Sequence, residues 1–299
     1  MKMSDKAKEN SLKIYFLIAF LIPIIATLLV ILKEGLQTGL VTTQISGSAI
    51  IIIMSMVHAP TIAAVIAVFR DEGFEGIRKL LHQLKYWRFS LKWYLLALLV
   101  FPFAILTGLL IMTYISPVYK PVFSLNILAV GTLISPLWEE IGWTGFATPR
   151  MLKRYSPLKA GIYLGVIHLF WHQTAAFWGS GVFYGNLYLA SFFLWMAGLI
   201  ALRIITMWIY LRTNSLVLGW LTHVSYTGGQ MILVPLSLTA LETVLWNTAL
   251  VLVLLFILVC FVSTNKDFRD FWKSGLDEGI NKLKNITIGS SQSSASRTQ

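Results

Sequence analysis

Long apolar stretches constrain the fold of this chain more than any other feature. A helix that crosses the roughly 30 Å hydrocarbon core of a membrane needs about 20 predominantly apolar residues. Eight stretches approach or exceed this length, at residues 12–32, 46–69, 93–116, 126–148, 160–178, 185–211, 215–236 and 239–263. Only 12% of the 299 residues are charged, too few to coat a soluble domain. The sequence predicts an all-α, polytopic membrane helical bundle with about eight transmembrane helices.

The distribution of basic residues predicts how the bundle lies in the membrane. Cytoplasmic loops accumulate Lys and Arg. Of the 24 basic residues, Lys33 and Lys120 occupy one set of loops, Arg203 lies deep inside a span, and the rest lie in or directly beside the alternate loops and the termini. We therefore expect a multi-pass protein of the cell membrane with both termini in the cytoplasm. The charge of +11 is spread along juxtamembrane segments, which favours membrane lipid over nucleic acid as the partner.

Residues 1–284 are predicted to form a single transmembrane domain. Two segments outside the spans, 70–92 and 268–283, carry apolar residues at helical spacing among charges. This pattern is typical of amphipathic helices on the cytoplasmic membrane surface. Residues 285–299 are rich in Ser, and we expect a disordered cytoplasmic tail there.

Polar residues inside four of the spans predict one shared site. Glu139 and Glu140 are adjacent within the stretch 126–148, and a carboxylate at membrane depth marks a functional site because it is costly to place there. Counting about 1.5 Å per residue from the nearest cytoplasmic basic residue places Glu139 and His223 about 16 Å deep. The same count gives about 20 Å for His172 and about 14 Å for Arg203. The spans therefore bring these side chains to one layer.

The two glutamates are expected to have different roles. Adjacent side chains on a helix point about 100° apart, so both cannot face one pocket equally. One carboxylate should meet the substrate and the other should support it. A carboxylate that takes a proton from water and later returns it acts as a general base and acid. A histidine from a neighbouring helix can hold the same water.

Three motifs resemble those of a known family. The first is Glu139-Glu140-Ile-Gly-Trp-Thr-Gly-Phe146 with Pro149-Arg150, the second is Gly165-Val-Ile-His-Leu-Phe-Trp-His172, and the third runs from Arg212 through His223. In this order they resemble the motifs of the CPBP intramembrane proteases, also called the Abi or type II CAAX prenyl endopeptidase family. The resemblance covers roughly residues 70–230, which would be the protease-like core.

The resemblance implies an eight-span enzyme that hydrolyses a peptide bond inside the membrane. By position, Glu139 and His172 would activate the water, while Glu140 and His223 would complete the site and stabilise the oxyanion. The family's best-known substrates have prenylated C-termini, and a membrane peptide is the alternative substrate.

The sequence departs from the family pattern at three supporting positions. Thr144 stands where the family has Arg four residues after the second Glu, Thr227 where it has Asn four residues after the last His, and His168 where an aromatic residue is common. Glu140 therefore lacks its usual i+4 partner. Either Glu140 stays protonated, or Arg203 or Arg150 supplies the missing cation. The hydroxyl of Thr227 can still donate a hydrogen bond.

A zinc ion is an open alternative. His168, His172, His223 and Glu139 would offer three nitrogens and one oxygen, which suits tetrahedral Zn²⁺. An HxxxH pair without an intervening Glu is, however, not the familiar protease signature. The family is often labelled metalloprotease, and a metal-free glutamate mechanism is also argued for its members.

The leading hypothesis is an intramembrane endopeptidase that acts on a peptide or a lipidated protein. Two other classes of function stay open. One is a non-catalytic scaffold or bacteriocin-immunity protein that keeps the pocket and binds a partner. The other is a proton-coupled transporter in which the same side chains relay protons, although the sequence shows no inverted repeat of the kind that such carriers have.

Overall fold

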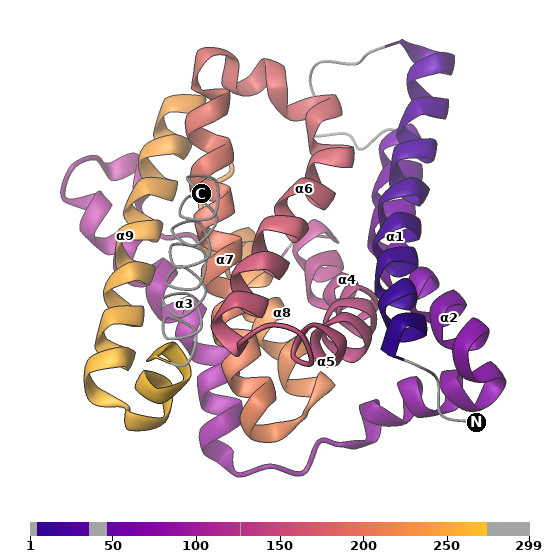
Figure 1. Ribbon diagram of the computed structural model, residues 1–299. Coiled ribbons are helices and arrows are strands. Elements are labelled where there is room, and N and C mark those ends of the chain that lie inside the picture. Colours follow the sequence, from indigo (N-terminus) through magenta and orange to yellow (C-terminus); the bar gives the residue numbers. More distant parts are fainter. Residues whose placement is uncertain (1–4, 36–46, 126, 274–299) are drawn as a thin grey trace, which may run out of the picture.

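Helices form the described part of the chain, in which no strand occurs (Figure 1). The computed structural model describes residues 5–35, 47–125 and 127–273, and the side chains among them except those of 5–9, 49, 127–128 and 175–183. The helices are α1 (Asp5–Glu34), α2 (Gly47–His82), α3 (Leu91–Thr113), α4 (Ile127–Gly142), α5 (Thr148–Met151), α6 (Pro157–Tyr184), α7 (Tyr188–Thr213), α8 (Leu216–Leu233) and α9 (Ala240–Thr264). The prediction of an all-α fold is confirmed.

Five helical segments of the described chain are long and apolar enough to cross a membrane. They are Asn10–Glu34, Ile50–Lys85, Leu91–Thr113, Gly185–Thr213 and Ala240–Thr264. The three other predicted spans correspond to α4, α6 and α8, which carry the glutamates and the histidines of the motifs. α4 by itself is only 16 residues long, but it continues without a break through a π-helical turn, Trp143–Ala147, into α5. A multi-pass membrane protein is supported, while the count of eight spans stays a prediction.

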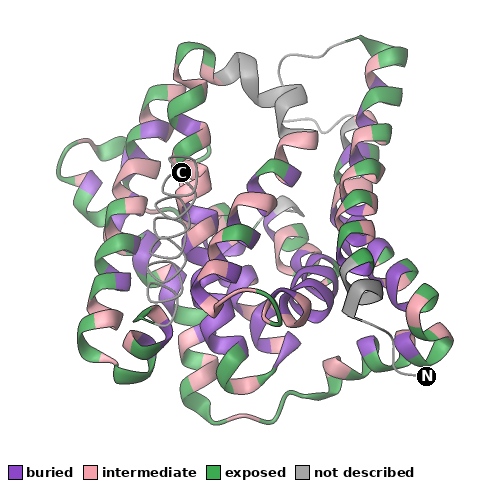
Figure 2. Cartoon of the chain, in the orientation of Figure 1, coloured by how far each residue is buried: buried purple, intermediate pink, exposed green. Residues whose placement is uncertain are grey.

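The helices that carry the motifs lie in the middle of the bundle. α1 packs against α2, α3 packs against α8 and α9, and α4 lies between α2 and α8. Figure 1 shows α1 and α2 at one side and α3 and α9 at the other, with α4, α6, α7 and α8 between them. Buried residues concentrate around α4, α5, α7 and α8 (Figure 2). The motifs therefore lie in the best-packed part of the molecule.

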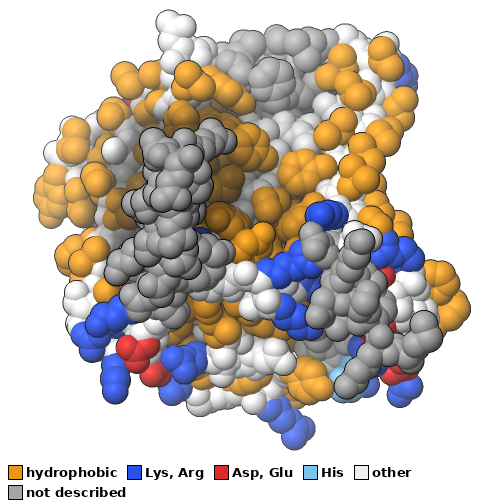
Figure 3. Space-filling view, viewed as in Figure 1, with side chains coloured by type: hydrophobic (Ala, Val, Ile, Leu, Met, Phe, Trp, Pro, Cys, Tyr) orange, Lys and Arg blue, Asp and Glu red, His pale blue; other side chains and the backbone are white. Residues whose placement is uncertain are grey.

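The described basic side chains gather at one end of the bundle. Figure 3 shows Lys and Arg in the lower part of the view, where α2 and α7 end and α3, α6 and α8 begin. We call this the basic end. The opposite end carries the α6–α7 and α8–α9 connections, and we call it the far end. This segregation agrees with the predicted alternation of loops.

The two predicted surface helices are only partly as expected. Gly73, with φ 63° and ψ −152°, interrupts α2, because this conformation suits a residue without a Cβ. Beyond it the chain is helical to residue 85 and not helical over 86–90, so the segment 70–92 is not one helix. Of the segment 268–283, only 268–273 is described; there Phe268 is fully buried, with its ring 5.0 Å from that of Trp208. The rest of that segment and the tail 285–299 lie outside the described residues.

A close contact between α2 and α4 fixes the helix that carries both glutamates. The hydroxyl of Thr61 donates a hydrogen bond to the carbonyl of Trp138, immediately before Glu139. Two residues after Glu140, Gly142 packs against the backbone of Pro60 so tightly that a Cβ there would collide with the Pro60 carbonyl. Glycine is therefore required at this position by packing.

Gly142→Ala should push α4 away from α2. Overpacking of this kind costs about 1–3 kcal/mol of unfolding free energy. The matched control is Gly131→Ala on the same helix, where an added Cβ meets nothing within 4 Å. The control should be neutral or more stable by up to about 1 kcal/mol, because Ala favours a helix over Gly. Thermal unfolding in detergent measures both, and equal melting temperatures would contradict the packing argument.

Candidate functional site

Glu140 is fully buried, and side chains from three helical segments contact its carboxylate. The Nη1 atom of Arg203 on α7 and the Nδ1 atom of His223 on α8 each lie 2.8 Å from its Oε1 atom. The Thr144 hydroxyl donates a hydrogen bond to Oε2. Glu140 is 0% and Arg203 is 1% exposed. Since a buried carboxylate is tolerated when it is paired and hydrogen-bonded, this arrangement favours the ionised form of Glu140.

Arg203, and not Arg150, supplies the cation that Glu140 lacks along its own helix. The guanidinium of Arg150 instead lies 3.6 Å from the centre of the Phe146 ring and donates a hydrogen bond to the Phe146 carbonyl. The alternative that Glu140 stays protonated is disfavoured, because a neutral carboxyl would leave the buried guanidinium without a counter-charge.

The same arginine orients His168. Its Nε and Nη2 atoms lie 3.2 and 3.1 Å from Nδ1 of His168. A guanidinium only donates hydrogen bonds, so Nδ1 must accept, and the proton of the neutral imidazole is then on Nε2. This tautomer is inferred from the contacts. The Nε2 atom lies 3.4 Å from Oε2 of Glu139, so Arg203 is linked directly to Glu140 and through His168 to Glu139.

A π-helical turn follows the two glutamates directly. It spans Trp143–Ala147, and the Thr148 hydroxyl donates to the Trp143 carbonyl at 3.0 Å. π-Helical turns inside α-helices are rare and often occur at functional sites. The turn buries Trp143 between His168 and Trp171, with ring centres 5.4 Å from each. The turn thereby places Trp143 in a cluster of aromatic rings beside His168.

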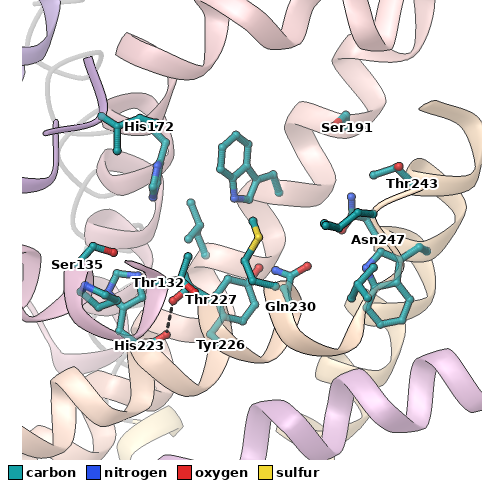
Figure 4. A pocket seen from close by; sticks show the side chains of 18 of the residues that line it. Thr132, Ser135, His172, Ser191, His223, Tyr226, Thr227, Gln230, Thr243 and Asn247 are labelled. Atoms are coloured by element: carbon teal, nitrogen blue, oxygen red, sulfur yellow. Dashed lines mark hydrogen bonds between the residues drawn. The ribbon is translucent and has the colours of Figure 1, made fainter. Parts of the chain in front are cut away.

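A cavity of about 530 Å³ reaches Glu139. Glu139, His172, His223 and Thr227 line it, whereas Glu140, Thr144, His168 and Arg203 are not among the described lining residues. Figure 4 shows Ser135, His172 and His223 at one end of this cavity and Ser191, Thr243 and Asn247 at the other. The predicted site residues therefore form two layers: one faces the cavity, and the other lies behind it.

Glu139 and His172 are placed to hold one water molecule. Their ligand atoms lie within 4.8 Å of each other, a separation that a water can bridge with two hydrogen bonds. The Nε2 atom of His168 contacts one Glu139 carboxylate oxygen, Oε2. The His172 ring lies against Trp195, with ring centres 5.2 Å apart and planes 35° apart. Packing on Trp195 restricts the orientation of the imidazole that faces Glu139.

Thr227 is bonded to its own helix. Its hydroxyl donates to the carbonyl of His223 at 3.1 Å, the contact drawn as a dashed line in Figure 4. A substrate oxygen would have to compete with this carbonyl for the proton. The predicted hydrogen bond of Thr227 is therefore donated within its own helix.

The zinc hypothesis meets an obstacle at His168. Within the described residues, Glu139, His168 and His172 form a group of metal-ligand type, to which His223 does not belong. A zinc-bound histidine needs a free lone pair on the ligating nitrogen and a proton on the other one. His168 has the reverse arrangement, since Nδ1 faces the donors of Arg203. The predicted four-residue set therefore does not fit a tetrahedral zinc site.

Sequence reasoning missed most of the cavity lining, including Gln230 and Trp195. Gln230 lies seven residues after His223 on α8, so helical spacing places both on one face, and this signal could have revealed it. Trp195 has no comparable signal, because nothing in its local sequence distinguishes it from other apolar residues of α7.

Removing the buried cation should destabilise the protein strongly. Arg203→Leu leaves the Glu140 carboxylate buried and unpaired, which costs about 3–5 kcal/mol. Arg203→Leu combined with Glu140→Leu removes both charges and should recover much of this loss. Arg203→Lys should lie between, because an ammonium lacks the planar fork that contacts Glu140 and His168 together. Thermal unfolding in detergent tests the order, and a single Leu variant as stable as the parent would refute it.

Comparison with known proteins identifies the region that holds this site. Residues 121–228 match the family of Rce1-like type II CAAX prenyl endopeptidases. No curated protein matches the chain. The matched region contains Glu139, Glu140, His168, His172, Arg203 and His223. The resemblance seen in the three motifs is confirmed: residues 121–228 belong to the type II CAAX prenyl endopeptidase family, the CPBP or Abi family.

Proposed function

We propose that this protein is an intramembrane endopeptidase in which Glu139 activates water to hydrolyse a peptide bond. One observation carries the proposal. Glu139 has one carboxylate oxygen beside His168 and lies at the cavity wall within 4.8 Å of His172. A base with a water site next to a cavity is the minimum that hydrolysis requires.

The reaction follows from the two layers of the site. Glu139 takes a proton from the water held with His172, and the water oxygen attacks the scissile carbonyl carbon. The carbonyl π electrons move to its oxygen, which becomes an oxyanion. When the C–N bond breaks, Glu139 returns the proton to the leaving nitrogen. Glu139 thus acts first as a base and then as an acid, and it ends the cycle in its starting form.

His223 is the proposed oxyanion partner. Glu140 is paired with Arg203 and accepts from Nδ1 of His223 at 2.8 Å. The negative charge of Glu140 favours the imidazolium form of His223, which burial and the charge of Arg203 oppose; in that form the Nε2–H can donate to the developing oxyanion. Glu140 and Arg203 act through His223 and His168, as positioning residues.

We also propose that the chain crosses the membrane eight times and has both termini in the cytoplasm, because the described Lys and Arg side chains gather at the basic end. The substrate is proposed to be either a lipidated protein or a membrane peptide, since both agree with the family. A non-catalytic scaffold would retain the cavity and yet have no use for the network that orients Glu139. Loss of turnover with retained folding distinguishes an enzyme from such a scaffold.

Glu139→Gln should abolish turnover and leave the fold intact. The amide keeps the shape of the side chain but cannot accept the proton of water, and loss of a general base costs about 10²–10⁴-fold in rate. The purified protein in liposomes is incubated with a fluorogenic lipidated peptide and, separately, with a membrane proteome whose new termini are read by mass spectrometry. Cleavage by Glu139→Gln equal to that of the parent would end the proposal.

A pair of histidine variants controls this test. His172→Gln should lose activity, because it removes the second ligand of the water. His58→Gln should not, because His58 lies outside the cavity and contacts the Met54 carbonyl of its own helix at 2.8 Å. Both substitutions remove one half-buried imidazole from a helix. Equal loss in the two would point to general destabilisation.

Chelation should leave the activity unchanged. Because the tautomer of His168 opposes metal ligation, we expect the same rate before and after dialysis against 1,10-phenanthroline. The measurement is peptide cleavage together with metal analysis of the purified protein. A loss of activity that zinc restores would favour a metal-dependent reaction and reverse this assignment.

A further inference from the structure

The cavity occupies one half of the bundle, between the glutamates and the far end. It is lined on α4 by Thr132, Ser135 and Glu139, and on α8 by His223, Thr227 and Gln230. These series repeat every three or four residues, so each is one face of a helix. Glu139 and His223 are the members nearest the basic end. They therefore form the floor of the cavity.

The other walls place its mouth at the far end. Ile53, Ser191 and Thr243 lie in the first two turns of α2, α7 and α9, which all begin at that end. Rim residues are open to the surroundings: Leu236, in the α8–α9 connection, is 63% exposed, and Met231 is 38% exposed. The basic loops lie at the opposite end (Figure 3).

The walls of the cavity bear almost no formal charge. Besides Glu139 and the imidazoles of His172 and His223, its polar side chains are mainly hydroxyls and amides, of which Figure 4 labels Thr132, Ser135, Ser191, Gln230, Thr243 and Asn247. None of the described lining residues is Lys or Arg, and Glu139 is the one carboxylate among them. While Glu139 acts as a base it is negatively charged, so a terminal carboxylate near it would meet a like charge that no Lys or Arg among the described lining residues offsets.

We infer that the cavity takes an uncharged, internal segment of a membrane peptide, which enters from the far end. This inference rests on the proposed function and narrows its substrate class. A volume of about 530 Å³ holds a short stretch of chain but not a folded domain. Since the basic end is expected to face the cytoplasm, the segment arrives from the outer side of the membrane. A free C-terminus presented from the cytoplasm is disfavoured, because its negative charge would face Glu139 and because it would arrive at the end of the bundle opposite the mouth of the cavity.

Sidedness is tested by cysteine labelling, which needs no activity. Cys260, which is a free thiol, is first replaced by Ser. Gln230→Cys then reports on the cavity, and Lys153→Cys, an exposed residue of the basic end, is the matched control. A membrane-impermeant maleimide should label Gln230→Cys in intact cells and Lys153→Cys only in inverted vesicles. Labelling of Gln230→Cys only in inverted vesicles, or from neither side, overturns the inference.

The charge preference is tested with paired peptides. Two peptides share a sequence and end three residues after the cleaved bond, one as a carboxylate and one as an amide. The amide should be cleaved with a kcat/KM about tenfold higher or more, because it avoids the like-charge contact with Glu139. Asn247→Lys places a cation in the wall and should reduce this ratio. Equal or faster cleavage of the carboxylate peptide by the parent overturns the preference.

The two experiments separate failure of the inference from failure of the proposed function. If Glu139→Gln cleaves as the parent does, the protein is not the proposed enzyme, whatever the labelling shows. If cleavage depends on Glu139 but Gln230→Cys reacts only from the cytoplasmic side, the enzyme stands and the direction of entry is wrong.

Discussion

The buried pair of Glu140 and Arg203 is the interaction on which the site depends. It joins α4 to α7 at 2.8 Å, in a place where neither charge reaches solvent. Each partner also holds a histidine, since Glu140 contacts His223 and Arg203 contacts His168. Such pairs carry a large desolvation penalty, so their benefit lies less in stability than in fixing one arrangement of side chains. Here that arrangement directs one glutamate to the cavity and the other away from it.

The separation of the two glutamates could be predicted from the sequence, because adjacent helical residues point in different directions. The convergence of Glu139, His172 and His223 also followed from counting residues along apolar spans. The partner of Glu140 could not be chosen in this way. Arg203 lies 63 residues from it, and Arg150 was an equal candidate until the packing of α7 on α6 was known. The π-helical turn and the direction of the cavity depend on tertiary packing in the same way.

The predicted spans show where hydropathy alone fails to identify a membrane-spanning helix. Four of the helices that hydropathy and length identify as spans, α1, α2, α3 and α9, lie around the site, and the fifth, α7, carries Arg203 within it. α4 by itself is too short, while α6 and α8 carry polar residues that lower their mean hydropathy. A polar site inside a membrane is tolerated only if other helices shield it from lipid. The motif-bearing helices are therefore the hardest to recognise by composition and the easiest by sequence pattern.

Thr144 shows how the Glu140 carboxylate restricts which residues can occupy positions 144 and 203. Its side chain fills the space against α8, where a Cβ on Gly219 would lie 3.0 Å from it. An arginine at 144 would have no room there and would crowd a second guanidinium around a carboxylate that Arg203 already neutralises. Positions 144 and 203 should thus covary among homologues: a cation arises at one as it disappears from the other.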